Sequence, residues 1–233
     1  MDGAHARRGG GLAAPHPGSG RAAAADGGAG APGARPIVVV SGVPRSGTSL
    51  AMQMLAAGGV PVLADAARPP DASNPRGYFE WAPARRLAEA PERIAAARGR
   101  AVKIVSALVP ALPPGERYCV LWLARDPREV ARSQRAMLAR LAAARGAPPP
   151  ADDGVSAEML ARHAARARAA LAARPDAAAL DVAHRELLAR PAAAAARIAA
   201  FLAPHLGLRL DEAAMAAVVD PALWRERAAD ARA

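Results

Sequence analysis

Short apolar runs alternate with amphipathic segments along most of the chain. Runs rich in Val, Ile, Leu and Ala predict five strands, at about 36–41, 60–65, 101–106, 117–124 and 177–183. Apolar residues at helical spacing predict helices at about 48–57, 83–98, 126–146, 156–173 and 192–206. This alternation predicts an α/β fold of three layers, with a central parallel sheet between two layers of helices.

Composition separates this domain, expected over 36–225, from its two ends. Residues 1–35 are nearly all Ala, Gly, Pro and Arg, so they are expected to form a disordered tail. Residues 226–233 are expected to be a flexible C-terminus. The chain shows neither a signal-peptide core nor about 18 consecutive apolar residues, so neither secretion nor a membrane span is expected. The single cysteine, Cys119, is expected to be buried, which fits a cytoplasmic protein.

The net charge indicates an anionic ligand or partner. Lys and Arg total 31 against 21 Asp and Glu, which gives a formal charge of +10. The arginines are scattered and not interleaved with aromatic residues, so nucleic acid is not an expected partner. Lys103 is the only lysine of the chain. It is either a chance survivor or a residue with a chemical role, and composition does not decide between the two.

The segment "SGVPRSGTSL" at 41–50 has the form of a phosphate-binding loop between a strand and a helix. Gly42 and Gly47 frame the loop, and the backbone N–H groups of 46–49 can point into one concavity. Further groups suited to a phosphate are the charge of Arg45 and the hydroxyls of Ser46, Thr48 and Ser49. Thr48 stands where P-loop nucleotide hydrolases have a lysine, which disfavours an ATPase or GTPase. The alternative is a tight turn that holds no ligand.

A second segment, "RDPREVARSQ" at 125–134, provides another pair of phosphate-binding groups. Arg125 ends the fourth predicted strand, and Ser133 follows eight positions later in the helix that Asp126 and Pro127 begin. An arginine at a strand end and a serine in the next helix can hold one phosphate from two sides. Glu129 and Arg132, beside Ser133, are expected to lie on a solvated face of this helix.

Together these segments resemble the sulfotransferases that use 3′-phosphoadenylyl sulfate (PAPS), and "NPRGYFEW" is typical of bacterial members. The resemblance covers about 36–224 and implies a P-loop-like fold without a required metal. It implies that the 5′-phosphosulfate is held by Arg45, Ser46, Gly47, Thr48 and Ser49. It also implies that Arg125 and Ser133 hold the 3′-phosphate, and that Lys103 and Arg45 stabilise the leaving phosphate. His184 corresponds to a family aromatic residue that contacts adenine.

Two departures from this family concern catalysis and cofactor closure. Val105 stands where many cytosolic members have a catalytic histidine, and the C-terminal segment has no clear counterpart of their glycine-rich lid. The resemblance then implies a carboxylate base downstream of the loop. Asp65 and Glu80 both qualify; spacing favours Asp65, and apolar neighbours favour Glu80. The alternatives are a turn residue for Asp65 and a surface carboxylate for Glu80.

Three functions remain open at this stage. The first is transfer of a sulfuryl group from PAPS to a hydroxyl or amine of a small molecule or glycan. The second is a P-loop small-molecule kinase, which requires Mg²⁺, and the third is a non-catalytic nucleotide-binding relative. The remaining histidines, His163 among them, are expected at the surface or in the tail, and no spacing indicates a metal site. The acceptor and the oligomeric state are not encoded in any recognisable motif.

Overall fold

The computed structural model describes residues 35–65, 68–148 and 156–223. Five parallel strands form one sheet in the order β2-β3-β1-β4-β5. Their bounds are β1 Ile37–Gly42, β2 Val62–Leu63, β3 Ala101–Lys103, β4 Tyr118–Ala124 and β5 Ala177–Ala183. The predicted α/β class and parallel sheet are confirmed. Except for Arg35, the expected tail and the expected flexible C-terminus lie outside the described residues.

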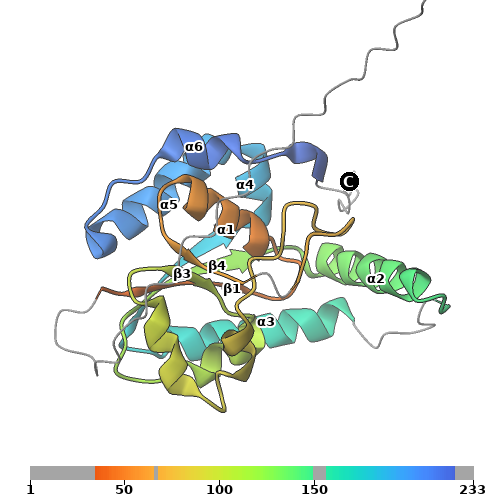
Figure 1. Ribbon diagram of the computed structural model, residues 1–233, viewed down its shortest axis with the longest axis horizontal. Coiled ribbons are helices and arrows are strands. Elements are labelled where there is room, and N and C mark those ends of the chain that lie inside the picture. The colour runs from red at the N-terminus through yellow and green to blue at the C-terminus, as the bar shows by residue number, and fades with distance from the viewer. Residues whose placement is uncertain (1–34, 66–67, 149–155, 224–233) are drawn as a thin grey trace, which may run out of the picture.

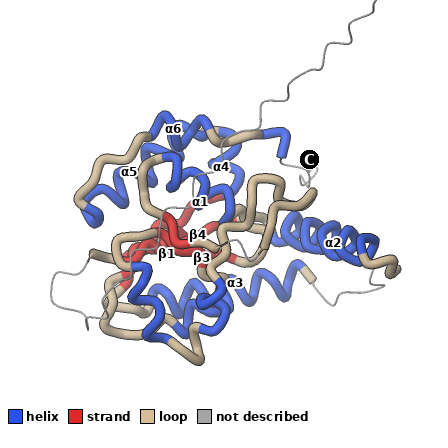
Figure 2. The backbone as a smooth tube through the Cα atoms, viewed as in Figure 1, coloured by secondary structure: helices blue, strands red, loops and turns tan. Residues whose placement is uncertain are grey.

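Helices cover both faces of the sheet, as Figures 1 and 2 show. The α-helices are α1 Thr48–Ala57, α2 Pro127–Ala144, α3 Ala157–Ala172, α4 His184–Ala189, α5 Pro191–Leu206 and α6 Glu212–Ala217. The 3₁₀ helices are η1 Ala82–Arg86, η2 Pro91–Ala97, η3 Ser106–Ala111 and η4 Pro221–Leu223. Among these described helices, none is long and apolar enough to span a bilayer.

The central strand β1 is buried on both faces, which explains its run of β-branched residues. Val38 and Val40 point into the apolar core beneath α1, α5 and α6. Ile37 and Val39 point into the core on the opposite face, which η1, η2, η3 and α3 cover. This alternation follows from the two-residue period of a strand, and it produces the three predicted layers.

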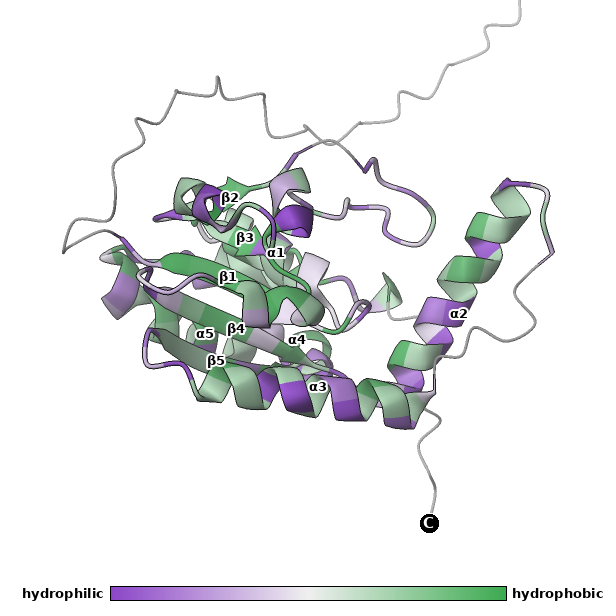
Figure 3. Cartoon of the chain, turned by 90° about the horizontal axis from the view of Figure 1, so that it is seen from below, coloured by the Kyte–Doolittle hydropathy of each residue, from purple (hydrophilic) through white to green (hydrophobic). Residues whose placement is uncertain are grey.

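The chain leaves the neighbouring strands β1 and β4 toward opposite faces of the sheet. After β1 it enters α1 on one face, whereas after β4 it runs through α2 to α3 on the other (Figure 1). A crevice therefore opens at the carboxyl ends of these strands, which is the place where parallel sheets bind ligands. Helix α2 begins there and extends beyond the sheet, so only its first turns are buried (Figure 3).

Three predicted elements differ from the structure. The helix expected over 83–98 is two 3₁₀ helices, η1 and η2, because Pro91 cannot donate a helical hydrogen bond and disfavours helical geometry at the preceding residue. The strand expected over 60–65 is reduced to Val62–Leu63. The strand expected over 101–106 ends at Lys103, and Ser106 instead begins η3.

Candidate functional site

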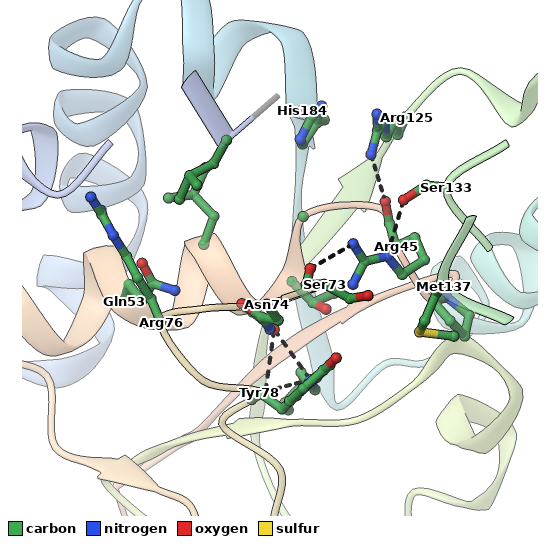
Figure 4. Close-up of a pocket in the computed structure, with 18 of the residues that line it drawn as sticks. Arg45, Gln53, Ser73, Asn74, Arg76, Tyr78, Arg125, Ser133, Met137 and His184 are labelled. Carbon is green, nitrogen blue, oxygen red and sulfur yellow. Dashed lines mark hydrogen bonds between the residues drawn. The ribbon is translucent and has the colours of Figure 1, made fainter. Parts of the chain in front are cut away.

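A pocket lies at the carboxyl ends of β1, β3 and β4, where segments far apart in the sequence meet. Its walls are the loop after β1, the start of α1, the loop over 68–80, one face of α2 and the start of α4. Further lining residues are Lys103, Val105, Arg125, Asp220 and Leu223. Figure 4 shows side chains from these segments pointing toward one another across the pocket. Most of the residues that the sequence singled out line it, but Ser46 and Asp65 do not.

Ser46 is a buried part of the loop after β1. Its N–H donates to the carbonyl of Val43 at 3.0 Å, and its side chain is fully buried. The hydroxyl lies against Gly42, where an added Cβ would come within 2.4 Å of Ser46 Oγ. Gly42 therefore has no room for a side chain. The hydroxyl of Ser46, which the sequence analysis expected to contact a ligand, is buried and has no hydrogen-bond partner within the described residues.

Gly47 connects the loop to α1 and keeps the start of this helix accessible. Its φ of +102° lies in the left-handed region, and it caps α1 without any side chain. The N–H groups of the first turn have no acceptors within a helix, so Thr48 and Ser49 offer backbone donors at the pocket wall. Together with the helix dipole, these donors favour an anion at this point.

The hydroxyl of Ser49 holds the neighbouring loop in place. It donates to the carbonyl of Tyr78 at 3.2 Å and accepts from Asn74 Nδ2 at 3.0 Å. Tyr78 is itself buried, and its hydroxyl donates to Asp71 at 2.8 Å. The loop over 71–78 is thereby fixed against the start of α1, so the hydroxyl of Ser49 serves the wall of the pocket in this structure.

Arg45 joins the two segments that the sequence predicts to bind phosphate. Its Nε donates to Ser133 Oγ at 3.1 Å, and Arg125 Nη1 donates to the carbonyl of Arg45 at 3.1 Å. Arg45 has a φ of +77°, unusual for a residue with a side chain, and its guanidinium also donates to the carbonyl of Ser73. Burial lowers the pKa of this guanidinium, and so do nearby cations such as Arg125. The site thus concentrates positive charge (Figure 4).

Glu129 is buried beside Arg125, and the expectation that it lies on a solvated helix face is wrong. It is 6% exposed, and its carboxylate accepts from Arg125 Nε at 2.9 Å. Because α2 starts at the end of β4, the face of its first turn that carries Glu129 and Val130 is buried, while Arg128 on the other face is exposed. The spacing of four residues was the available signal for this pair. The ion pair holds the guanidinium of Arg125 in one orientation.

Lys103 reaches the pocket from the end of β3, next to β1 in the sheet. Its Nζ donates to the carbonyl of Tyr78 and lies 3.5 Å from Ser49 Oγ and 3.9 Å from Glu80 Oε1. Burial is the main cause that lowers its pKa from 10.5 to about 8, while Glu80 acts in the opposite direction. The only lysine of the chain therefore lies at the centre of the site as a buried cation.

The two candidate carboxylates occupy different places. Glu80 lines the pocket near Lys103 and forms ion pairs with Arg68 and Arg85. Asp65 is exposed outside it; its N–H donates to the carbonyl of Glu80, and its carboxylate accepts from the N–H of Ala82 at the start of η1. Asp65 thus orders the turn that presents Glu80, and only Glu80 shares the pocket with Lys103.

His184 closes the pocket opposite Arg45. It begins α4 at the end of β5 and is 8% exposed. Its ring lies so close to Gly47 that an added Cβ there would come within 2.6 Å of His184 Cδ2. Burial lowers its pKa to about 4, and the charge of Arg125 contributes in the same direction. The imidazole is therefore neutral near pH 7. Its ring packs against Gly47 in the loop over 42–47, which we call the glycine loop.

The loop over 68–80 and the outer part of α2 contribute residues that the sequence analysis missed. Arg68, Asn74 and Arg76 come from the loop, and Arg140 comes from α2. Arg68 and Arg140 lie outside every sequence motif described above, and within "NPRGYFEW" the sequence analysis expected a site role for Glu80 but not for Asn74 or Arg76. Within the described residues, no group of three or more His, Cys, Asp or Glu side chains could hold a metal ion.

Comparison with solved structures gives a similarity to a sulfotransferase domain. No family model matches the chain, and no curated protein matches it. Among solved structures, the sulfotransferase domain of the olefin synthase from Synechococcus PCC 7002 matches with 20% sequence identity and a TM-score of 0.48. The match covers 85% of this chain and 90% of that one. A TM-score below 0.5 is too low to support an assignment of function, so the function must be argued from the site.

Proposed function

We propose that this protein is a sulfotransferase that moves a sulfuryl group from PAPS to a hydroxyl or amine of an acceptor. The observation that carries the proposal is that two anion-binding segments, 88 residues apart at Arg45 and Ser133, are hydrogen-bonded to each other in one pocket. The only lysine of the chain lies in the same pocket. A donor with a 3′-phosphate and a 5′-phosphosulfate requires two such anion sites, with the transfer centre next to the site that holds the phosphosulfate.

The residues of the pocket suit the parts of this donor. The first-turn N–H groups of α1 and the Thr48 hydroxyl suit the 5′-phosphosulfate, because both offer donors at a helix N-terminus. Arg125 and Ser133 suit the 3′-phosphate, with Glu129 fixing the direction of the arginine. His184 offers a neutral ring at the pocket wall, which suits contact with adenine.

In the proposed reaction, Glu80 is the base and Lys103 stabilises the leaving group. The acceptor oxygen or nitrogen attacks sulfur while its proton passes to the Glu80 carboxylate. The new bond to sulfur forms as the bond from sulfur to the 5′-phosphate oxygen breaks, and that oxygen takes the electron pair. Lys103 and the start of α1 then stabilise the charge that accumulates on 3′,5′-ADP. Glu80 is preferred to Asp65 because it lines the pocket, with Oε1 3.9 Å from Lys103 Nζ.

A kinase is the competing function, and the pocket argues against it. Thr48 replaces the lysine that reaches the outer phosphates of ATP, and the acidic residues lining the pocket are limited to Glu80 and Asp220 within the described chain. Asp220 is paired with Arg76 at 3.2 Å. A Mg²⁺ bound to phosphates would therefore find little carboxylate support.

Ligand-induced thermal stabilisation tests the proposal directly. At about 100 times its Kd, 3′,5′-ADP is expected to stabilise the folded protein by about 2.7 kcal/mol. ATP with Mg²⁺ at the same concentration is expected to give a smaller shift. Stabilisation by ATP with Mg²⁺ but not by 3′,5′-ADP would overturn the proposal in favour of a kinase. Binding of 3′,5′-ADP without transfer to any alcohol, sugar, phenol or amine would favour a non-catalytic relative.

A further inference from the structure

Besides Arg76, which forms an ion pair with Asp220, two arginines of the pocket lie outside the segments predicted to bind phosphate. Arg68 comes from the loop over 68–80, and Arg140 comes from α2. We call this pair the outer arginines. Arg68 Nη2 lies 3.8 Å from Met137 Sδ, and Arg140 Nη1 donates to Ser73 Oγ at 3.2 Å. The carbonyl of Ser73 also accepts a hydrogen bond from Arg45. The outer arginines therefore lie next to the proposed donor site, but they are not among the residues assigned to the donor.

Helix α2 carries Arg140 on the same face as Ser133 of the proposed 3′-phosphate site. Ser133, Met137 and Arg140 are four and three positions apart, so they follow one another along one face of the helix. Arg140 therefore lies about 10 Å along the helix axis from Ser133, since an α-helix rises about 1.5 Å per residue. Figure 4 shows Met137 and Ser133 on the same side of the pocket.

Arg68 lies beside the proposed base, and Arg140 lies beside Ser73. Arg68 Nη1 is 3.4 Å from Glu80 Oε1, and its guanidinium stacks 3.4 Å from the centre of the Tyr78 ring. Arg140 is exposed, and within the described residues it contacts no carboxylate. Both arginines line the pocket, and Met137, which Arg68 contacts, precedes Arg140 by three positions on α2. Their guanidinium groups therefore offer positive charge along one part of the pocket wall.

We propose that the acceptor carries an anionic group, a carboxylate or a sulfate or phosphate ester, which the outer arginines bind. This inference rests on the proposed function, and it adds the chemical class of the acceptor. The anionic group would lie against Arg68 and Arg140 while the nucleophilic hydroxyl or amine lies near Glu80. Arginine suits such a group because its planar fork of donors matches two acceptor oxygens.

Calorimetric titration of inorganic sulfate into the full-length protein saturated with 3′,5′-ADP tests this proposal. Ionic strength is held constant with chloride, because exposed charges are screened by salt. Wild type is expected to bind sulfate, and Arg140→Gln and Arg68→Gln are each expected to weaken that binding about tenfold. Arg128→Gln is the matched control, because Arg128 is exposed on the same helix and lies outside the pocket. It is expected to bind sulfate as wild type does.

The affinity for 3′,5′-ADP, measured on the same variants, separates the possible outcomes. It is expected to change less than about twofold in Arg140→Gln and Arg68→Gln. If 3′,5′-ADP binds wild type but sulfate does not bind that complex, the anionic acceptor is excluded. If both variants weaken 3′,5′-ADP as much as sulfate, the outer arginines belong to the donor site and the proposal is overturned. If 3′,5′-ADP does not bind wild type, the proposed function itself fails, and the acceptor role fails with it.

Discussion

Arg45 Nε donates a hydrogen bond of 3.1 Å to Ser133 Oγ, across 88 positions of sequence. Arg125 completes the link by donating to the carbonyl of Arg45. The glycine loop and the start of α2 therefore form one structural unit, so a change in one should alter anion binding at the other. The predictions below follow from this unit and from the residues around it.

Ser133→Ala is expected to weaken 3′,5′-ADP binding about tenfold. The change removes one hydroxyl that can donate to a phosphate, and it leaves Arg45 Nε without its acceptor, a loss of about 1–2 kcal/mol. Calorimetric titration measures the affinity. Ser106→Ala is the matched control, because Ser106 is also buried and bonded, to His163 at 2.8 Å, but lies outside the pocket. An equal loss of affinity in both variants would contradict a specific role for Ser133.

Glu80→Gln is expected to lower kcat by a factor of about 10² to 10⁴ and to change 3′,5′-ADP binding little. The amide keeps the shape of the side chain but cannot accept the acceptor proton. Asp65→Asn is expected to lower kcat far less, because Asp65 is exposed outside the pocket and acts through the turn that leads to Glu80. Initial rates with labelled PAPS measure both. A larger loss in Asp65→Asn would assign the base to Asp65.

The activity should depend on the protonation of Lys103. Its pKa is about 8 in the folded protein, so kcat/KM is expected to fall as pH rises above about 8, where the positive charge near the leaving phosphate is lost. Initial rates between pH 6 and 10, a range of roughly two units on each side, measure this profile. Lys103→Arg is expected to remove the fall, since arginine stays protonated there. A fall that persists unchanged in Lys103→Arg would assign it to another group.

Lys103 should also affect stability, which is expected to rise with pH over the range where activity falls. The folded pKa of about 8 lies below the unfolded value of 10.5, so the unfolded chain binds more protons between these two values. The free energy of unfolding is therefore expected to rise with pH across this window, by a few kcal/mol at most. Denaturant unfolding at several pH values measures it. Lys103→Met is expected to abolish this contribution, and a rise of the same size in that variant would contradict the assignment.

Gly47→Ala is expected to destabilise the protein more than Gly59→Ala. Both glycines have a positive φ, +102° and +90°, so both substitutions introduce backbone strain of about 1–3 kcal/mol. Only at Gly47 would the new Cβ also come within 2.6 Å of His184, since nothing lies within 4 Å of a Cβ at Gly59. Denaturant unfolding compares the two variants. Equal losses would show that contact with His184 adds no cost.

Several elements of the fold could be predicted from patterns among residues that are neighbours in sequence. The β-branched run that ends in Gly42 and the cap formed by Asp126 and Pro127 depend on neighbours in sequence, so β1 and the start of α2 could be located in advance. The run "YCVLWLA" likewise identified β4, with Cys119 buried inside it. The segment over 83–98 failed as a single helix because Pro91 outweighed its apolar spacing.

The sequence by itself determined the parallel α/β fold and the two segments that meet at its carboxyl edge, because hydrophobic period, glycines and caps act over a few residues. Only the tertiary structure decided which side chains face the pocket. Packing turned the Ser46 hydroxyl inward, buried Glu129 beside Arg125, and brought Glu80 to Lys103. The outer arginines entered the site in the same way. These placements depend on contacts between segments far apart in the chain, which no local pattern records.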